Sequence, residues 1–146
     1  ILLMAEQAPD GAAPRVAGLI LTGEHVGQLR RVLAESFAEQ TRLQIALLAT
    51  IDGRVVAQEA RVGLDAVKLA ALGSTMMSMA AAAVREIGGK TPDECLLTHA
   101  GGILCIGRTG PLGRLVLCLA AGADLNMGLL VSGWRRTASA IAAAVQ

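Results

Sequence analysis

The chain has 146 residues, a formal net charge of +1 and 53% hydrophobic residues, but only one Trp, one Phe and no Tyr. This length fits a single domain that buries most of its apolar surface without disulfides or metals. The small net charge argues against a basic surface that follows phosphates, and the lack of aromatic residues argues against base stacking, so nucleic acid is not an expected partner. The high apolar fraction suggests that a partner covers part of the surface, and we expect self-association.

The first 21 residues contain Pro9, Gly11 and Pro14 and are predicted to form a flexible leader before a single domain over residues 22–146. They lack the basic region and cleavage site of a secretory signal. Because the chain starts at Ile1, Met4 is a candidate for the native start.

The cysteines Cys95, Cys105 and Cys118 each lie within an apolar run and show no C-x-x-C spacing. This pattern favours small buried hydrophobic residues over a disulfide or a zinc site. We therefore expect a protein of the reducing cytoplasm.

Helical spacing of apolar residues predicts an amphipathic helix over residues 24–40, from Val26 to Phe37. Two strands are predicted next, over residues 43–50 and 55–60. They flank Asp52-Gly53, which is the strongest short-range signal for a β-hairpin.

The most informative segment is a predicted helix that begins at the N-cap Asp65 and ends at Ile87, because no formal charge lies between Lys68 and Arg85. One stripe is predicted to face the core: Leu69, Leu72, Met76, Met79, Ala83 and Ile87. The opposite stripe, which should be charged if it faced water, is also apolar or small, and such a helix is normally buried on all sides. The segment is too short for a membrane span, so we expect a second copy of the helix to cover it.

Three further strands are predicted over residues 95–99, 103–107 and 115–120, and a last helix runs from Asp124 or Asn126 to Val145. The order αββαβββα predicts an α+β fold. Residues 45–49 and 115–120 are apolar on both faces, so helices should cover both sides of the sheet. Strand 95–99 looks like an edge without a Lys, Pro or bulge to block pairing with another chain.

No motif in the chain predicts catalysis. Gly89-Lys90-Thr91 resembles the end of a phosphate-binding loop, but Val84 stands where the first glycine is required. His25 and His99 have no neighbouring residues at metal-ligand or triad spacing. We expect no enzyme activity, no metal and no cofactor.

The chain resembles the roadblock family (dynein light-chain roadblock domains), in particular its bacterial MglB-like branch. Four segments carry the resemblance: residues 47–57 (LLATIDGRVVA), 69–72 (LAAL), 99–104 (HAGGIL) and 123–130 (ADLNMGLL). None of them is a catalytic signature, so the match is one of pattern and element order.

The resemblance implies a five-stranded antiparallel sheet in the order 2-1-5-4-3, with the middle helix on one face and the two terminal helices on the other. It also implies a homodimer that pairs the middle helices and the third strands. The residues expected at that interface are Ala70, Ser74, Met77, Ser78, Ala81, Arg85, Leu96, Leu97 and Thr98.

Members of the bacterial branch bind Ras-like small GTPases, and some stimulate GTP hydrolysis while others act as scaffolds. The resemblance therefore implies a homodimeric regulator or scaffold for such a GTPase. The residues expected to reach this partner are Met77, Arg54 and Arg108. Two alternatives stay open: a small-molecule sensor with a pocket against the sheet, and a structural dimerisation module without a GTPase partner.

Overall fold

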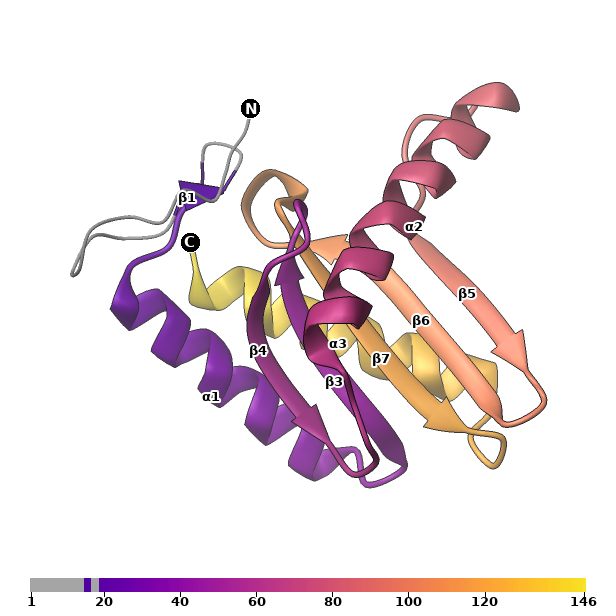
Figure 1. Ribbon diagram of the computed structural model, residues 1–146, viewed down its shortest axis with the longest axis horizontal. Coiled ribbons are helices and arrows are strands. Elements are labelled where there is room, and N and C mark those ends of the chain that lie inside the picture. Colours follow the sequence, from indigo (N-terminus) through magenta and orange to yellow (C-terminus); the bar gives the residue numbers. More distant parts are fainter. Residues whose placement is uncertain (1–14, 17–18) are drawn as a thin grey trace.

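The computed structural model describes residues 15–16 and 19–146 of the chain. Three helices and a five-stranded sheet follow one another in the predicted order (Figure 1). The elements are β1 (Arg15–Val16), β2 (Leu19–Ile20), α1 (Gly23–Glu39), β3 (Leu43–Thr50), β4 (Val55–Ala60), α2 (Ala66–Glu86), β5 (Glu94–His99), β6 (Gly102–Thr109), the short 3-10 turn η1 (Pro111–Gly113), β7 (Leu115–Gly122) and α3 (Met127–Ala144).

The sheet is antiparallel throughout and has the order β4-β3-β7-β6-β5, which confirms the predicted order 2-1-5-4-3. The Asp52-Gly53 hairpin is also confirmed. Gly53 has a φ of 93°, a conformation that a glycine adopts without strain, and the Thr50 hydroxyl accepts a hydrogen bond of 3.0 Å from the Arg54 amide. This pairing leaves β4 and β5 as the two edges.

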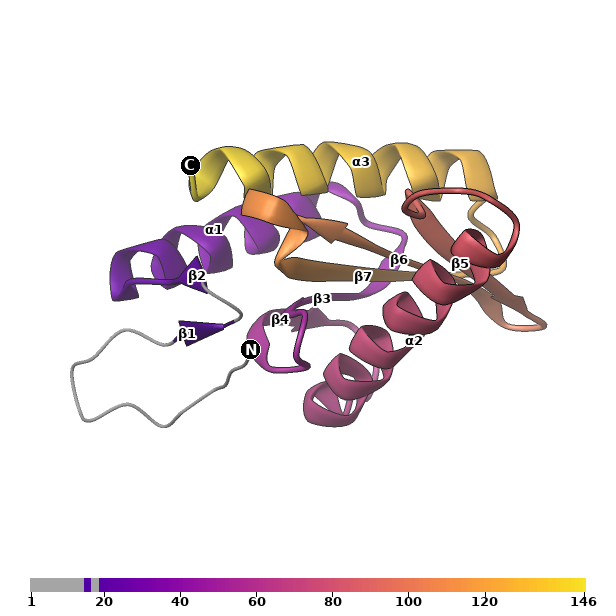
Figure 2. The same cartoon turned by 90° about the horizontal axis from the view of Figure 1, so that it is seen from above.

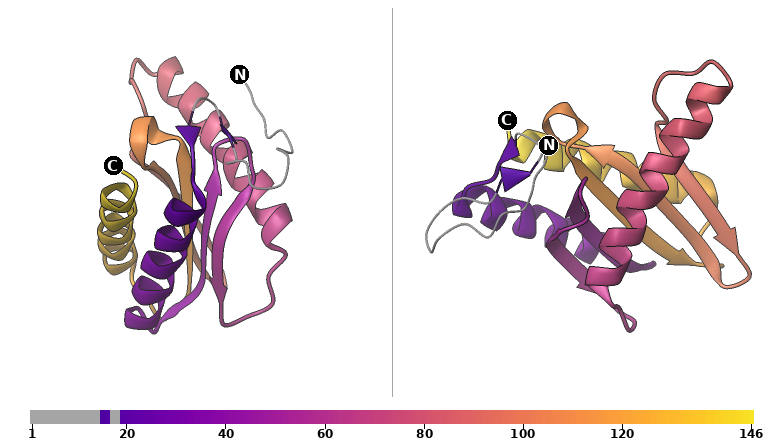
Figure 3. Two further views of the ribbon diagram at one scale, coloured as in Figure 1. Left: turned by 90° about the vertical axis from the view of Figure 1, so that its left-hand side faces the viewer. Right: turned by 45° about the horizontal axis from the view of Figure 1, so that its top comes forward.

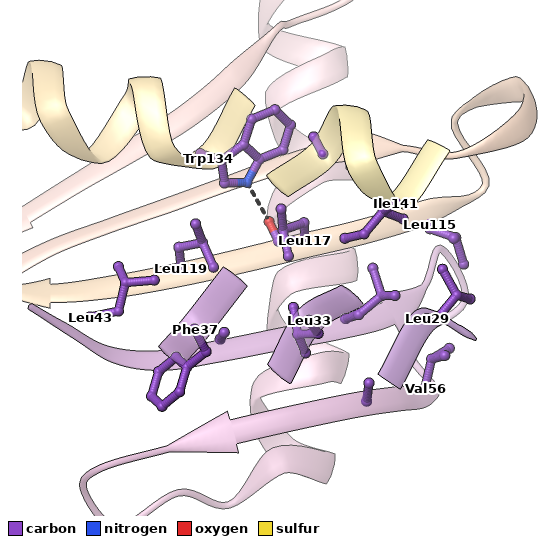
Figure 4. Packing of buried hydrophobic residues seen from close by; sticks show 14 of the residues in the cluster. Leu29, Leu33, Phe37, Leu43, Val56, Leu115, Leu117, Leu119, Trp134 and Ile141 are labelled. Atoms are coloured by element: carbon purple, nitrogen blue, oxygen red, sulfur yellow. Dashed lines mark hydrogen bonds between the residues drawn. The ribbon is translucent and has the colours of Figure 1, made fainter. Parts of the chain in front are cut away.

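Helices cover the two faces of the sheet unequally, with α1 and α3 on one face and α2 on the other (Figure 2). The larger core lies under α1 and α3, where Leu29, Leu33 and Trp134 pack on β3 and β7 (Figure 4). The Trp134 indole donates a hydrogen bond of 2.9 Å to the Leu117 carbonyl. Trp134 lies directly on Gly107, where a Cβ atom would come within 2.4 Å of the ring.

Side-chain caps begin all three helices, and two of the caps, Asp65 and Asn126, are at positions that the sequence indicated. The carboxylate of Asp65 accepts a hydrogen bond from the Lys68 amide at 3.1 Å, and the side chain of Asn126 accepts one from the Leu129 amide at 2.8 Å. Thr22 caps α1 in the same way. Each cap satisfies an amide that has no partner inside its helix.

The leader predicted over residues 1–21 lies mostly outside the described residues. Its described part contains β1 and β2, which pair with each other and not with the main sheet. Leu21 is buried in the core under α1.

Candidate functional site

Helix α2 packs on the sheet through its smallest side chains. Ala66, Ala70, Gly73 and Met77 are its buried residues, at spacings of four, three and four. Beneath them lie Leu47, Ile106, Val116 and Cys118 of the sheet, among other buried residues. The small residues bring the helix close to the strands, and Met77 fills the remaining space.

The predicted orientation of this helix is wrong in part. Leu69 and Met76 of the predicted core stripe do pack against the core under α2. Leu72 and Met79 of the same stripe are exposed instead, and Ala70 and Met77, which we expected to face a partner, are buried on the sheet. The physical reason is size, because the sheet face is already filled by large side chains and accepts a helix with a small face. Between Lys68 and Arg85 the helix also has no charged residue, so it gives no polar stripe from which its rotation can be predicted.

The outer face of α2 carries no charge between Lys68 and Arg85, and no other element of the described part of the chain covers it. Val67, Leu72 and Met79 are 73%, 52% and 66% exposed. By length and composition alone α2 would also suit a membrane span, but one such helix is weak evidence and its inner face packs on the sheet. Such a face on a domain of this size indicates a binding surface.

The turn between β3 and β4 forms one border of this face. The Ser74 hydroxyl donates a hydrogen bond to the Ile51 carbonyl, and a Cβ atom on Gly53 would lie 3.3 Å from Cα of Ala71. These contacts hold the turn that carries Arg54 beside the first half of α2.

The other border is the edge strand β5, which pairs only with β6 in the described sheet. Its last four residues are exposed, including Leu96 at 38% and Leu97 at 42%. The last turns of α2 extend past this edge of the sheet (Figure 3, right). An edge with free backbone groups and apolar side chains is able to pair with another strand.

The residues predicted for a dimer interface fall into three groups. Ala70 and Met77 are buried within the protomer and do not belong to an outer surface, which corrects their predicted role at the interface and, for Met77, at a GTPase. Ser74 is half-buried and bonded to Ile51. The others are exposed or, for Ala81, half-buried: Ser78, Ala81, Arg85, Leu96, Leu97 and Thr98.

Sequence reasoning missed Val67, Leu72 and Met79 as surface residues. The signal that would have found them is the spacing of Ala66, Ala70 and Gly73, which marks the side of the helix that approaches another layer closely.

Arg54 and Arg108 lie at the same end of the sheet. Arg108 is exposed near the end of β6, and the Ile51 amide donates a hydrogen bond of 3.1 Å to the Arg114 carbonyl, which joins the two loops. The Arg54 loop borders the outer face of α2, so this arginine is closer to the candidate surface.

In the part of the chain that the structure describes, no group of three potential metal ligands comes together. Cys105 and Cys118 are buried, and burial raises the pKa of each thiol to about 12, so both stay protonated near neutral pH. Cys95 is half-buried against the α2 core.

An apolar helix face beside an open strand edge, on an antiparallel sheet covered by helices on both sides, defines an α+β interaction domain. The model of the Roadblock/LC7 domain family matches residues 31–121, which is more than half of the chain, and the protein belongs to this family.

Solved structures with the same fold include MglB proteins. Gliding protein MglB from Thermus thermophilus is 20% identical, with a TM-score of 0.74, and the match covers 86% of this chain and 93% of that one. MglB from Myxococcus xanthus is 15% identical, with a TM-score of 0.75 and coverage of 88% and 98%. A structure described as MglB with tetrameric arrangement is 21% identical, with a TM-score of 0.75 and coverage of 86% and 93%. Among curated protein sequences, none matches significantly.

Proposed function

We propose that the protein is a homodimeric regulator or scaffold that binds a Ras-like small GTPase through the face carrying α2. One observation carries this proposal: the outer face of α2, with Val67, Leu72 and Met79, is apolar, exposed and bordered by the open edge of β5. Two copies that pair their β5 edges would bring their α2 helices to the same face of one continuous sheet. The rest of that face would remain for the GTPase.

Membership of the Roadblock/LC7 family supports a regulatory or scaffolding role. One similar structure is described as a gliding protein and another as having a tetrameric arrangement, which supports a role in gliding for a protein that assembles with further copies. The buried, protonated thiols fit the reducing cytoplasm that we propose as its location. In this proposal any effect on GTP hydrolysis is exerted on the catalytic residues of the GTPase.

A test of the homodimer is the mass in solution at micromolar concentration, measured by light scattering for the wild type and for Met79→Glu. A charge buried without a partner costs about 3–5 kcal/mol, so the dimer of Met79→Glu should be at least ~100-fold weaker. Ala38→Glu, on the exposed side of α1 at the opposite face, is the matched control and should leave the mass unchanged. A wild type that shows only the mass of the single chain, 14.9 kDa, would overturn the homodimer.

A test of the partner uses purified Ras-like GTPases of the source organism, each loaded with GDP or with the non-hydrolysable analogue GppNHp. We expect one of them to bind in the GppNHp form, and Leu72→Glu to weaken that binding while Ala38→Glu does not. If none binds with a preference for either nucleotide, the GTPase partner is refuted and only the structural dimer stands.

A further inference from the structure

The face of the sheet opposite α2 is incompletely covered. Helix α1 packs on β4 and β3, and α3 packs on β6 and β7, so neither helix covers β5. Glu94 and Leu96 point to this face, since Glu94 pairs with Arg135 of α3 and side chains two residues apart share a face. Helix α1 borders one flank of α3, and the other flank is open.

An open groove of about 790 Å³ follows this flank of α3 down to β5. Its apolar residues include Leu96 at 38% and Met127 at 42% exposure, with Val131 half-buried between them. Gly128 and Ser132 add little bulk to the wall, so a helix backbone could approach α3 closely.

Two arginines, Arg135 and Arg136, line the groove, and the lining itself contains no carboxylate. The charge of Arg135 is offset by Glu94 at 2.9 Å and by the nearby charge of Asp93, both of which raise the pKa of Arg135. Arg136 is exposed and forms no ion pair with any residue in the ranges that the structure describes. The unpaired charge would therefore attract an acidic group at the rim.

The width of the site follows from strand spacing if the homodimer proposed above joins the two β5 edges. With strands about 4.8 Å apart, α3 lies about 8–10 Å from the two-fold axis, and its two copies lie about 16–20 Å apart. A packed helix needs about 8–10 Å to each neighbour. The trough between the two α3 helices thus has room for one helix, with Leu96 of both copies as its floor.

We propose that this groove binds an amphipathic α-helix of a partner protein, with an apolar stripe on Leu96, Met127 and Val131 and acidic residues beside Arg136. Helices α3 and α2 lie on opposite sides of the sheet (Figure 2), so the groove beside α3 lies opposite the α2 face. The protein would therefore hold a GTPase on one side and a second protein on the other, as a scaffold does. This inference rests on the proposed homodimer.

The experiment uses the full chain and a fluorescein-labelled helical peptide of about 20 residues, with Leu at helical i, i+3, i+4, i+7 spacing and Glu on both flanks. A second peptide with Gln in place of each Glu is the charge control. Fluorescence anisotropy gives the affinity, and amide chemical shifts locate the peptide. Met127→Glu and Arg136→Glu test the groove. Leu129→Glu, in the same first turn of α3 but outside the groove lining, is the matched control.

We expect the Glu peptide to bind at least tenfold more tightly than the Gln peptide, and to shift amides of β5 and α3. Met127→Glu and Arg136→Glu should each weaken it at least tenfold, and Leu129→Glu should not. Equal binding to all variants, or shifts confined to α2, would overturn the inference. A tetramer that Met127→Glu splits into dimers would also overturn it, because the groove then holds a second dimer.

Light scattering on the same samples separates the two proposals. If the protein is a dimer but does not bind the peptide, only the groove as a binding site is refuted. If the protein is a monomer, the homodimer is refuted, and so is the trough between the two α3 helices.

Discussion

Gly73 of α2 lies against the side chain of Cys118 in the central strand β7, and a Cβ atom at position 73 would be 3.0 Å from Sγ. This is closer than normal van der Waals contact, so the absence of a side chain at Gly73 fixes how near α2 comes to the sheet. The same contact directs Leu72, the preceding residue, away from the sheet. The exposed apolar face thus depends on a glycine beneath it.

Gly73→Leu should lower the free energy of unfolding by about 1–3 kcal/mol, because the new side chain has no space above Cys118. Urea denaturation monitored by circular dichroism measures the loss. Cys118→Ala in the same chain should recover part of it, with a coupling of at least about 0.5 kcal/mol. Strictly additive effects of the two changes would show that the two residues do not limit the packing of α2.

The three thiols should react at different rates. Burial raises the pKa of Cys118 to about 12, so near neutral pH its thiolate fraction is about 10³-fold below that of a thiol of pKa 9. The pKa of Cys105 is raised to a similar value, mainly by burial and next by the charge of Glu94. Stoichiometric labelling of the native protein should therefore modify Cys95 first. Rapid labelling of all three would contradict this assignment.

The same pKa shift predicts how stability changes in alkaline solution. The folded-state pKa of Cys118, about 12, lies above the unfolded value of 9.0, so below pH 9 the thiol is protonated in both states and contributes its full stability. As the pH rises above 9, only the unfolded state loses the proton, and stability falls by about 1.4 kcal/mol per pH unit. Cys105 has a similar shift, so urea titrations from about pH 8 to about pH 11 should show about twice this slope in the wild type and about half of the wild-type slope in Cys118→Ala. Identical slopes would refute the shift.

The sequence predicts the fold well because its signals are local and agree with one another. Asp52-Gly53 defines the hairpin, Asp65 and Asn126 define helix starts, and the unbroken apolar runs of β3 and β7 place these strands at the centre of the sheet. Chain order and the resemblance to a known family then supply the topology.

The rotation of α2 could not be predicted in the same way. No polar stripe marks the solvent side of this helix. Whether Ala70 or Leu72 faces the sheet depends on the space above Val116 and Cys118, which belong to another element. That space is a property of the tertiary structure and cannot be deduced from the sequence of the helix. The groove beside α3 was missed for a similar reason, because Leu96 and Met127 are far apart in sequence and meet only when α3 crosses the sheet.

Ser74→Ala tests the anchoring of α2 to the neighbouring turn. Loss of the hydrogen bond to the Ile51 carbonyl should cost about 0.5–1.5 kcal/mol, measured by urea denaturation. Ser78→Ala, at an exposed position one turn later, is the control and should change stability by less than about 0.5 kcal/mol. Equal effects of the two changes would mean that the Ser74 hydroxyl does not hold the turn.

An arginine finger is one way in which the proposed dimer would stimulate GTP hydrolysis. An arginine finger inserted into the GTPase is worth about 10³–10⁵ in rate, and Arg54 and Arg108 are the candidates at the hairpin ends. The Arg108 side chain lies along its own loop, because its Cδ atom is 3.6 Å from the place that a Cβ atom on Gly113 would take. Arg54 borders the α2 face, but on a short turn that Ser74 and Ala71 hold in place.

We therefore expect Arg54→Ala and Arg108→Ala to leave stimulated hydrolysis within a few-fold of the wild type, because in the function proposed above the dimer would act by ordering the catalytic residues of the GTPase. Single-turnover GTP hydrolysis with a GTPase that binds the protein measures this, and Leu72→Glu should lower stimulation by lowering affinity. A loss of about 10³-fold in either arginine variant, with affinity unchanged, would instead show that the protein supplies the arginine finger itself.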